Sequence, residues 1–382
     1  MSFISFIKNV LPLNKKAKKD INALSEYLEK KELKKLIKLI KNKKISISYS
    51  IIGAGKDFPE KEFPQIETKG YDEINNIISE KVYSSLYKEF SKKAKELIPK
   101  NIAPNIHGYD SIKEAVTLQL LSDEAIHILL LGDPGTGKTD IVSSAAKLSK
   151  ISSFGLGSGT SSVGLSVTVK GKNVEKGLLP LADKGLCAID ELNLMKDSDY
   201  GSLYNAMEKG FVSYDKGGNS FKFDARIKLL ATANPKNDKF KSDKLEDIKK
   251  QIPFDSALLS RFTLIFIIHR PDDKMFKEIG KKIISDSKIK FNSQTIEFIK
   301  NYISKAQEIK VDVPKKHEEE ILDLAQELRK NEDKIIFEIT PRLIKGIIRM
   351  TKASAKLELR NKVNEDDVKY IKKILFNSLN LK

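Results

Sequence analysis

The pattern of apolar and polar positions changes character along the chain, beginning with an N-terminal stretch of short elements. In residues 18–42, apolar side chains recur at helical spacing among lysines, which predicts one basic amphipathic helix. Its apolar face is expected to pack on the rest of the protein, although a membrane-binding or DNA-binding helix has the same pattern. Residues 45–52 alternate like a strand, residues 53–65 have the composition of a loop, and helical periodicity returns in residues 73–95. Residues 1–100 are therefore expected to form a mostly helical N-terminal region with a short strand.

Apolar runs and helical patterns then alternate, as they do in an α/β domain. The candidate strands are residues 126–132, 185–191, 227–234 and 263–269. The remaining residues are mostly helical in pattern. The sequence thus predicts an α/β core over residues 101–270, followed by a helical domain over residues 271–382.

The composition adds an excess of positive charge. Lys and Arg number 69 against 52 Asp and Glu, which leaves a net charge of +17. Such a charge favours an anionic partner, nucleic acid first and an acidic membrane surface second. Lysines scattered beside glutamates on solvated helix faces would produce the same total, so charge alone does not distinguish a nucleic-acid-binding protein from one with an ordinary lysine-rich surface.

Cysteine content and the N-terminus indicate the cellular compartment. No apolar run is long enough to predict a transmembrane helix, and the first residues are apolar before they are basic, the reverse of a signal peptide. Cys187 is the only cysteine, which excludes an internal disulfide and a zinc site built from cysteines. We therefore expect a cytoplasmic protein with no membrane partner and no zinc.

A phosphate-binding loop follows the first strand of the α/β stretch. Residues 132–139, GDPGTGKT, fit the pattern G-x-x-x-x-G-K-[ST] between a buried strand and a helix. Glycines let backbone N–H groups face phosphate oxygens, and the helix N-terminus adds partial positive charge. Lys138 is expected to contact the β- and γ-phosphates of ATP, and Thr139 to hold Mg²⁺. The residues predicted to contact the nucleotide are Asp133, Pro134, Gly135, Thr136, Gly137, Lys138, Thr139 and Asp190.

Polar side chains end two later strands. Asp190 and Glu191 close an apolar run, where Asp190 would hold Mg²⁺ through water and Glu191 would polarise the attacking water as general base. Asn234 ends the next strand and would orient that water. The Asn-Pro dipeptide also predicts a turn there, and the two roles are compatible.

Two arginines are informative in a chain that otherwise uses lysine. Arg261 lies between a leucine-rich helix end and a buried strand, where a monomer gives it no evident role. In a ring it would reach the neighbour's γ-phosphate as an arginine finger. Arg342 follows Thr340-Pro341, a helix start, and a nucleotide contact is favoured there over a surface salt bridge.

The order of these motifs resembles that of an AAA+ ATPase, and shorter segments resemble the minichromosome maintenance (MCM) replicative helicases. The resemblance covers about residues 80–382. The segments that carry it include NIAPNIHGYDSIKEAV, GSGTSSVGLSVTV, ADKGLCAIDELNLM, NAMEKGFVSYDKGG, LLATANP, LLSRFTLIF and TPRLIKGIIRMTKASAKLEL. It implies an α/β fold, with an AAA+ P-loop core built on a parallel sheet and a C-terminal helical lid.

The resemblance also implies roles for individual residues. Lys138 and Thr139 match the phosphate-loop pair, although the family usually has alanine and serine in this segment where GTGKT stands here. Asp190 and Glu191 match the Mg²⁺ and base carboxylates, and Asn234 the first sensor. Arg261 and Arg342 match the finger and the second sensor, which in the family act on the nucleotide of the adjacent subunit. The implied assembly is a ring, usually a hexamer.

Two insertions match places where MCM proteins project hairpins into a central channel. Residues 163–179 and 211–227 each have the pattern of two short strands around a turn. Lys216 stands where the family carries its channel lysine, and Lys170 and Lys172 lie in the turn of the first insertion. A lysine at a hairpin tip is suited to a phosphate backbone without base specificity. Sequence-independent contact with single- or double-stranded DNA is therefore expected, against the alternative of solvated turn lysines.

The sequence departs from the family at both ends. About 100 residues stand in place of the usual oligonucleotide-binding and zinc region, and no winged-helix pattern follows the lid. We therefore expect a truncated or divergent, archaeal-type MCM-like ATPase that couples ATP hydrolysis to DNA translocation or unwinding. Two alternatives remain: a MoxR- or magnesium-chelatase-like ATPase that remodels proteins, and an assembly factor that binds ATP without turnover.

Overall fold

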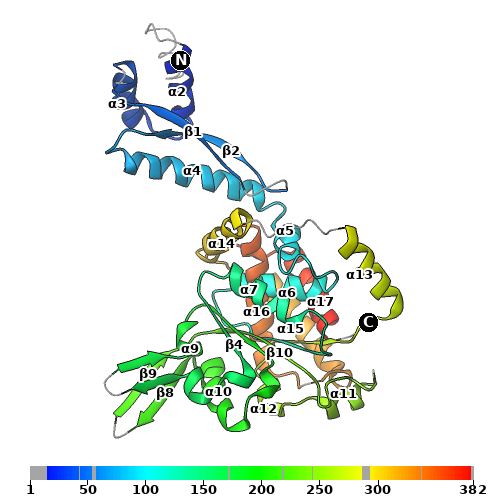
Figure 1. Ribbon diagram of the computed structural model, residues 1–382. Coiled ribbons are helices and arrows are strands. Elements are labelled where there is room, and N and C mark those ends of the chain that lie inside the picture. The colour runs from blue at the N-terminus through cyan, green and yellow to red at the C-terminus, as the bar shows by residue number, and fades with distance from the viewer. Residues whose placement is uncertain are drawn as a thin grey trace. The chain divides into compact units, whose positions relative to one another are not determined.

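The computed structural model describes the chain in two compact units (Figure 1). The first unit comprises residues 1–93 with 292–298, and the second comprises residues 94–291 with 299–382. The described residues are 15–42, 44–53, 57–170, 173–216, 219–242, 244–285, 293–336 and 338–379.

The first unit combines helices with one antiparallel strand pair. Its elements are α2 (Lys15–Ser25), α3 (Lys30–Lys41), β1 (Ile47–Ile52), β2 (Lys61–Ile66) and α4 (Asp72–Phe90). The prediction of a single helix over residues 18–42 is wrong, because the chain breaks before Lys30, where Glu29 and Glu32 form a capping box that starts α3. The loop prediction is wrong for β2, whose Pro64 lies opposite Tyr49 in a two-stranded ribbon. Proline is tolerated at such a sheet edge.

The apolar faces of α2 and α3 are buried inside this unit. Leu24 and Leu36 are almost fully buried, and α2 packs on α3 and on β2. The buried Asp20 accepts a hydrogen bond of 2.9 Å from the Tyr49 hydroxyl, which ties α2 to β1. The amphipathic pattern therefore corresponds to an apolar face packed against the protein, with the lysines between residues 15 and 38 directed to solvent.

The second unit is built on a five-stranded parallel sheet with the strand order β11-β3-β10-β7-β4. Its strands are β3 (Ile128–Gly132), β4 (Ser152–Leu156), β7 (Leu186–Asp190), β10 (Lys228–Ala233) and β11 (Leu264–Ile268). Four of them were predicted, whereas β4 was missed because its sequence, SSFGL, lacks an apolar run. The prediction of an α/β fold with a parallel sheet is confirmed.

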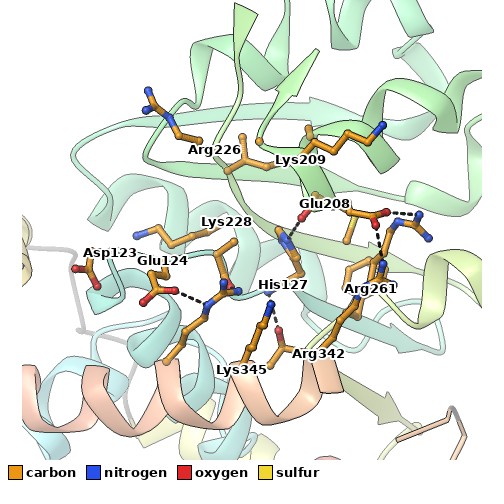
Figure 2. A pocket seen from close by; sticks show the side chains of 18 of the residues that line it. Asp123, Glu124, His127, Glu208, Lys209, Arg226, Lys228, Arg261, Arg342 and Lys345 are labelled. Atoms are coloured by element: carbon orange, nitrogen blue, oxygen red, sulfur yellow. Dashed lines mark hydrogen bonds and ion pairs between the residues drawn. The ribbon is translucent and has the colours of Figure 1, made fainter. Parts of the chain in front are cut away.

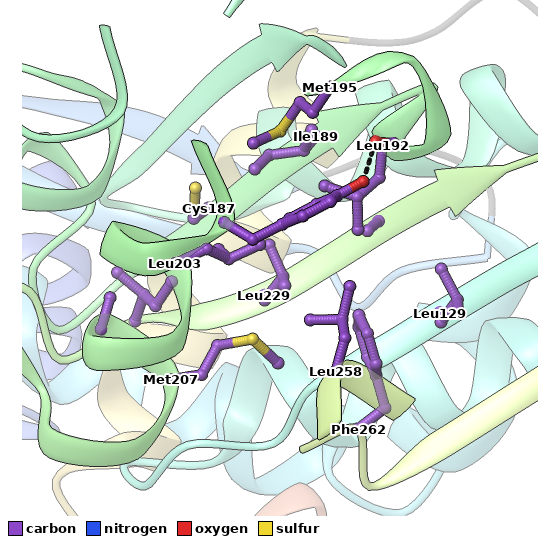
Figure 3. Packing of buried hydrophobic residues seen from close by; sticks show 14 of the residues in the cluster. Leu129, Cys187, Ile189, Leu192, Met195, Leu203, Met207, Leu229, Leu258 and Phe262 are labelled. Atoms are coloured by element: carbon purple, nitrogen blue, oxygen red, sulfur yellow. Dashed lines mark hydrogen bonds between the residues drawn. The ribbon is translucent and has the colours of Figure 1, made fainter. Parts of the chain in front are cut away.

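Helices and short turns connect these strands. They are α5 (Ala94–Lys100), α6 (Asp110–Leu121), α7 (Lys138–Leu148), η1 (Gly157–Gly159), α8 (Ser162–Leu165), α9 (Leu178–Leu181), η2 (Leu192–Leu194), η3 (Asp197–Asp199), α10 (Tyr200–Lys209), α11 (Leu245–Gln251) and α12 (Ser256–Leu259). One face of the sheet packs on α10 and α12 in a large apolar cluster (Figure 3). Helix α7 packs on β4, β7 and β10 through other residues of the strands. Burial on both faces explains why β3, β7 and β10 have continuous apolar runs, which β4 lacks.

The C-terminal part of the chain is helical, as predicted. Its elements are α13 (Asp273–Ser285), α14 (Ser293–Gln307), α15 (Lys315–Lys330), η4 (Glu332–Lys334), α16 (Pro341–Leu357) and α17 (Glu365–Ser378). Helix α16 packs on α6, α15 and α17. Apart from residues 293–298 at the start of α14, which belong to the first unit, the helical part and the sheet belong to the same compact unit. Among the described residues, no helix has both the length and the apolar character needed to span a membrane.

Two antiparallel hairpins extend from the second unit. The first pairs β5 (Val167–Lys170) with β6 (Asn173–Lys176), and the second pairs β8 (Phe211–Lys216) with β9 (Asn219–Asp224). Figure 1 shows the β8–β9 hairpin projecting away from the sheet. Lys170 and Lys216 are the last residues of β5 and β8, at the tip end of each hairpin, whereas Lys172 lies outside the described residues.

His127 joins three elements of the second unit just before β3. Its Nδ1 accepts a hydrogen bond of 3.1 Å from the Leu229 N–H of β10. Its Nε2 must then carry the proton, and it donates to the Met207 carbonyl oxygen of α10 at 3.2 Å. Burial lowers the pKa of His127 to about 4, with a further lowering by Arg349, so the ring is neutral in the folded protein.

This burial predicts a loss of stability in mild acid. The unfolded chain binds the His127 proton below about pH 6.5, whereas the folded protein does so only near pH 4. Lowering the pH through this window therefore favours unfolding, by up to about 3 kcal/mol at its lower end. Denaturant unfolding at several pH values should show the difference in stability between wild type and His127→Gln shrinking as the pH falls. A constant difference would contradict a neutral, buried His127.

Candidate functional site

The phosphate loop and the polar strand ends surround one pocket at the carboxyl edge of the sheet. Because β3, β10 and β7 are neighbours and run parallel, the loop after β3 lies beside the ends of the other two strands. The pocket has a volume of about 340 Å³. It is lined by Ile106, Pro134, Gly135, Thr136, Gly137, Lys138, Thr139, Asp140, Asp190, Glu191, Thr232 and Asn234.

Most of the predicted nucleotide residues line this pocket. Gly137 caps α7 with a φ of 80°, and a Cβ there would crowd the Ile106 side chain, so the loop requires glycine. The buried Lys138 ammonium donates to the carbonyl oxygens of Gly132 and Asp133, each at 2.7 Å. Burial lowers the pKa of Lys138 to about 8, and the nearby carboxylates, Asp133 first, oppose this shift. A phosphate group in the pocket would supply the anionic partner that a buried ammonium favours.

Asp133 has a different position from its neighbours in the loop. Its carboxylate accepts hydrogen bonds from the backbone N–H groups of Phe240, at 2.9 Å, and Arg270, at 3.2 Å. It is absent from the pocket lining. Its side chain thus ties the phosphate loop to the segments that follow β10 and β11, and any nucleotide contact from Asp133 would use its backbone.

Thr232, which the motifs did not single out, connects the Asp190 carboxylate to the backbone of Glu191. Its hydroxyl donates a short hydrogen bond to Asp190 Oδ1 and accepts one of 2.8 Å from the Glu191 N–H. Glu191 adopts a φ of 55°, a left-handed conformation that is costly for a residue with a side chain. Gly157 packs against the Glu191 carbonyl so closely that a Cβ would overlap it. These contacts hold the base candidate in a strained backbone conformation.

The backbone of Asn234, directly after β10, is also held by a neighbouring residue. The Asn234 N–H donates to the side-chain oxygen of Asn193 at 3.0 Å, and the Asn234 residue lines the pocket. Thr139 and Asp190 line it as well, and hydroxyl and carboxylate oxygens are ligands that Mg²⁺ prefers. The pocket therefore has the donors for a nucleotide and its metal ion.

Arg261 and Arg342 do not line this pocket. They line a separate cavity of about 810 Å³ near the amino ends of the strands, where His127 precedes β3, Thr263 precedes β11 and Lys228 begins β10. The two cavities have no lining residue in common. Five-residue strands such as β3 and β11 span about 16 Å, so the sheet itself separates the arginines from the phosphate loop of the same chain.

The second cavity is strongly basic. Eight basic and three acidic residues line it, and Figure 2 shows Glu208 at the end of α10 between Arg261 and Arg342. Glu208 binds Arg261 at 2.7 Å and Arg342 at 2.9 Å. The excess of positive charge makes this cavity suited to an anionic group from outside the chain.

The chain is similar to known proteins over most of its length. A family model of the MCM P-loop domain matches residues 85–287, which is more than half of the chain. The chain belongs to the MCM family. A model of the MCM AAA-lid domain matches residues 297–379 in addition. The family prediction from the motifs is confirmed, and the protein-remodelling alternative is not favoured.

Curated relatives agree with this assignment. "Minichromosome maintenance protein MCM" of Saccharolobus solfataricus is 31% identical over 83% of this chain and 51% of its own length. "DNA replication licensing factor mcm2" of Xenopus laevis is 29% identical over 74% of the chain and 37% of its own length. "DNA replication licensing factor mcm7" of Schizosaccharomyces pombe is 30% identical over 72% of the chain and 40% of its own length. The MCM chain described here thus spans about half the length of these relatives or less.

The MCM P-loop implies nucleotide binding, which Lys138 can test. Lys138→Ala removes the buried cation from the phosphate loop, so ATP affinity should fall about a hundredfold or more. Titration with a fluorescent ATP analogue measures this loss. Lys147→Ala, which changes an exposed side chain in the last turn of the same helix, is the control and should bind normally. Unchanged affinity in Lys138→Ala would exclude this pocket as the nucleotide site.

Proposed function

We propose that this MCM-family chain hydrolyses ATP at sites shared between neighbouring copies in a ring, usually a hexamer, and uses the energy to move along or unwind DNA. One observation carries the shared site: the arginines and the phosphate loop lie at opposite edges of one parallel sheet. A nucleotide bound to one chain is therefore out of reach of that chain's own Arg261 and Arg342.

One copy supplies the nucleotide pocket. Lys138 binds the β- and γ-phosphates, and Thr139 and Asp190 hold Mg²⁺, which neutralises charge on the phosphates when it is bound. Glu191 accepts the proton of the attacking water, and Asn234 orients that water. The hydrogen bonds of Thr232 and Asn193 at this edge support the assignment, because they hold the Asp190 carboxylate and the backbone N–H groups of Glu191 and Asn234 in position.

The adjacent copy supplies the arginines. Arg261 and Arg342 approach the γ-phosphate from the neighbour's side and stabilise the negative charge of the transition state, a contribution of about 10³-fold or more in rate for such arginines. The excess of basic residues around them supports contact with a polyphosphate.

DNA is the proposed polymer. The two hairpins offer lysines near their tips, and the relatives are named as MCM and DNA replication licensing proteins. Lys216, Lys170 and Lys172 contact the phosphate backbone without reading the sequence of bases. The net charge of +17 supports the same partner. The cytoplasm is the proposed site of action.

A mixing experiment tests the shared site. Arg261→Ala should bind ATP normally but lose about 10³-fold in hydrolysis, and Lys138→Ala should lose both. Mixed together, they should regain part of the ATPase activity, because an intact arginine from one variant meets an intact phosphate loop from the other. A mixture as inactive as its components would contradict sites shared between copies.

DNA stimulation tests the hairpins. In Lys216→Ala, the increase of ATPase rate caused by single-stranded DNA should shrink, and DNA retention should weaken with a smaller dependence on salt. Lys330→Ala, which removes an exposed lysine from the helical part, is the control for lost charge alone. Equal stimulation of wild type and Lys216→Ala would remove this hairpin from the DNA path.

A further inference from the structure

A single carboxylate connects the two arginines of the second cavity. Glu208, near the end of α10, receives Arg261 Nη2 on Oε2 at 2.7 Å and Arg342 Nη2 on Oε1 at 2.9 Å (Figure 2). The three side chains come from α10, the turn before β11 and the first turn of α16. Tertiary packing thus joins the sheet region to the helical lid at this carboxylate.

The two arginines are held to different degrees. Arg261 is 17% exposed; one face of its guanidinium lies 4.7 Å from the Tyr204 ring, and its Nη1 donates to the Ala257 carbonyl oxygen. Arg342 is 47% exposed, and apart from Glu208 its described contact is a distant one, 3.5 Å, to the Ser260 hydroxyl. Glu208 is therefore the main group that orients Arg342, and it aligns Arg342 with the better-held Arg261.

The carboxylate also reduces the repulsion between two cations. Burial alone would raise the pKa of the Glu208 carboxyl, but Arg342 and Arg261 hold this pKa below its usual range, so Glu208 is ionised. Each oxygen is used by one guanidinium, which leaves further N–H groups of Arg342 for another anion. The two guanidinium groups held by Glu208 form one paired cationic site. Because both are already positioned, binding a phosphate does not have to restrict their motion further.

A neighbouring ion pair shows what an ordinary contact in this cavity looks like. Glu124 binds Arg349 alone, at 2.9 Å, and is 50% exposed. A pair of this kind contributes little to stability. Glu208 differs because it bridges the two arginines to which the proposed function assigns contact with a neighbour's nucleotide.

We propose that Glu208 is a positioning residue that holds Arg261 and Arg342 together for the nucleotide of the adjacent copy. This inference rests on the proposed function, since it assumes that both arginines act on ATP bound by a neighbour. Glu208 itself does not contact the nucleotide; it acts through the two guanidinium groups.

Glu208→Gln tests the idea, because it keeps the size of the side chain but removes the charge that binds both arginines. We expect kcat for ATP hydrolysis to fall about tenfold or more, with the KM for ATP changed less than about threefold, since the phosphate loop is untouched. Glu208→Asp keeps the charge but shortens the reach, and it should fall between wild type and Glu208→Gln. Glu124→Gln is the matched control and should retain the wild-type rate.

Mixing distinguishes this role from a structural one. Glu208→Gln should regain activity when mixed with Lys138→Ala, because Lys138→Ala supplies intact arginines to the intact phosphate loop of Glu208→Gln. Failure of this mixture, under conditions where Arg261→Ala and Lys138→Ala do complement each other, would overturn the proposal. Wild-type kcat in both Glu208 variants would overturn it too, and the proposed function would still stand. If Arg261→Ala and Lys138→Ala also fail to complement, the proposed function falls, and the inference about Glu208 falls with it.

Discussion

The parallel pairing of β3, β10 and β7 is the constraint on which the rest of the MCM chain depends. Parallel strands give a sheet two unlike edges, one where all strands end and one where all begin. The phosphate loop, Asp190 and Asn234 lie at or directly after the carboxyl ends of neighbouring strands, so the strand order alone brings them together. Arg261 precedes a strand and is therefore placed at the other edge. The shared direction of the strands therefore puts the nucleotide pocket at one end of the sheet and Arg261 and Arg342 at the other.

Contacts with backbone groups position the residues of the nucleotide pocket. Glu191 has a left-handed conformation in which Thr232 binds its N–H and Gly157 leaves room for its carbonyl group. Lys138 is folded onto carbonyl oxygens of its own loop, which gives the ammonium partners inside a buried pocket. The edge is therefore largely arranged by the protein alone, and a nucleotide would need to displace few contacts.

Most of the first unit lies outside the part of the chain that resembles the MCM family. Residues 15–84 lie outside both family matches, so the MCM resemblance gives them no role. Most apolar positions of α2 and α3 are buried, and the lysines between residues 15 and 38 face solvent. Packing inside the first unit explains the amphipathic pattern of α2 and α3. The exposed lysines of these helices account for part of the positive charge of the chain.

The sequence by itself determined whatever depends on neighbours along the chain. The phosphate loop, the apolar strands ending in Asp190 and Asn234, and the helical C-terminal part can each be read from a short pattern, because burial and turn chemistry act over a few residues. The predictions of β4 and β2 failed because neither strand has the alternation or apolar run that marks a strand. Only the tertiary structure decided that Thr232 binds Asp190, that Asp133 anchors two distant segments and that Glu208 joins Arg261 to Arg342. These partners are tens of residues apart or more, and their meeting depends on how whole elements pack, which no local pattern records.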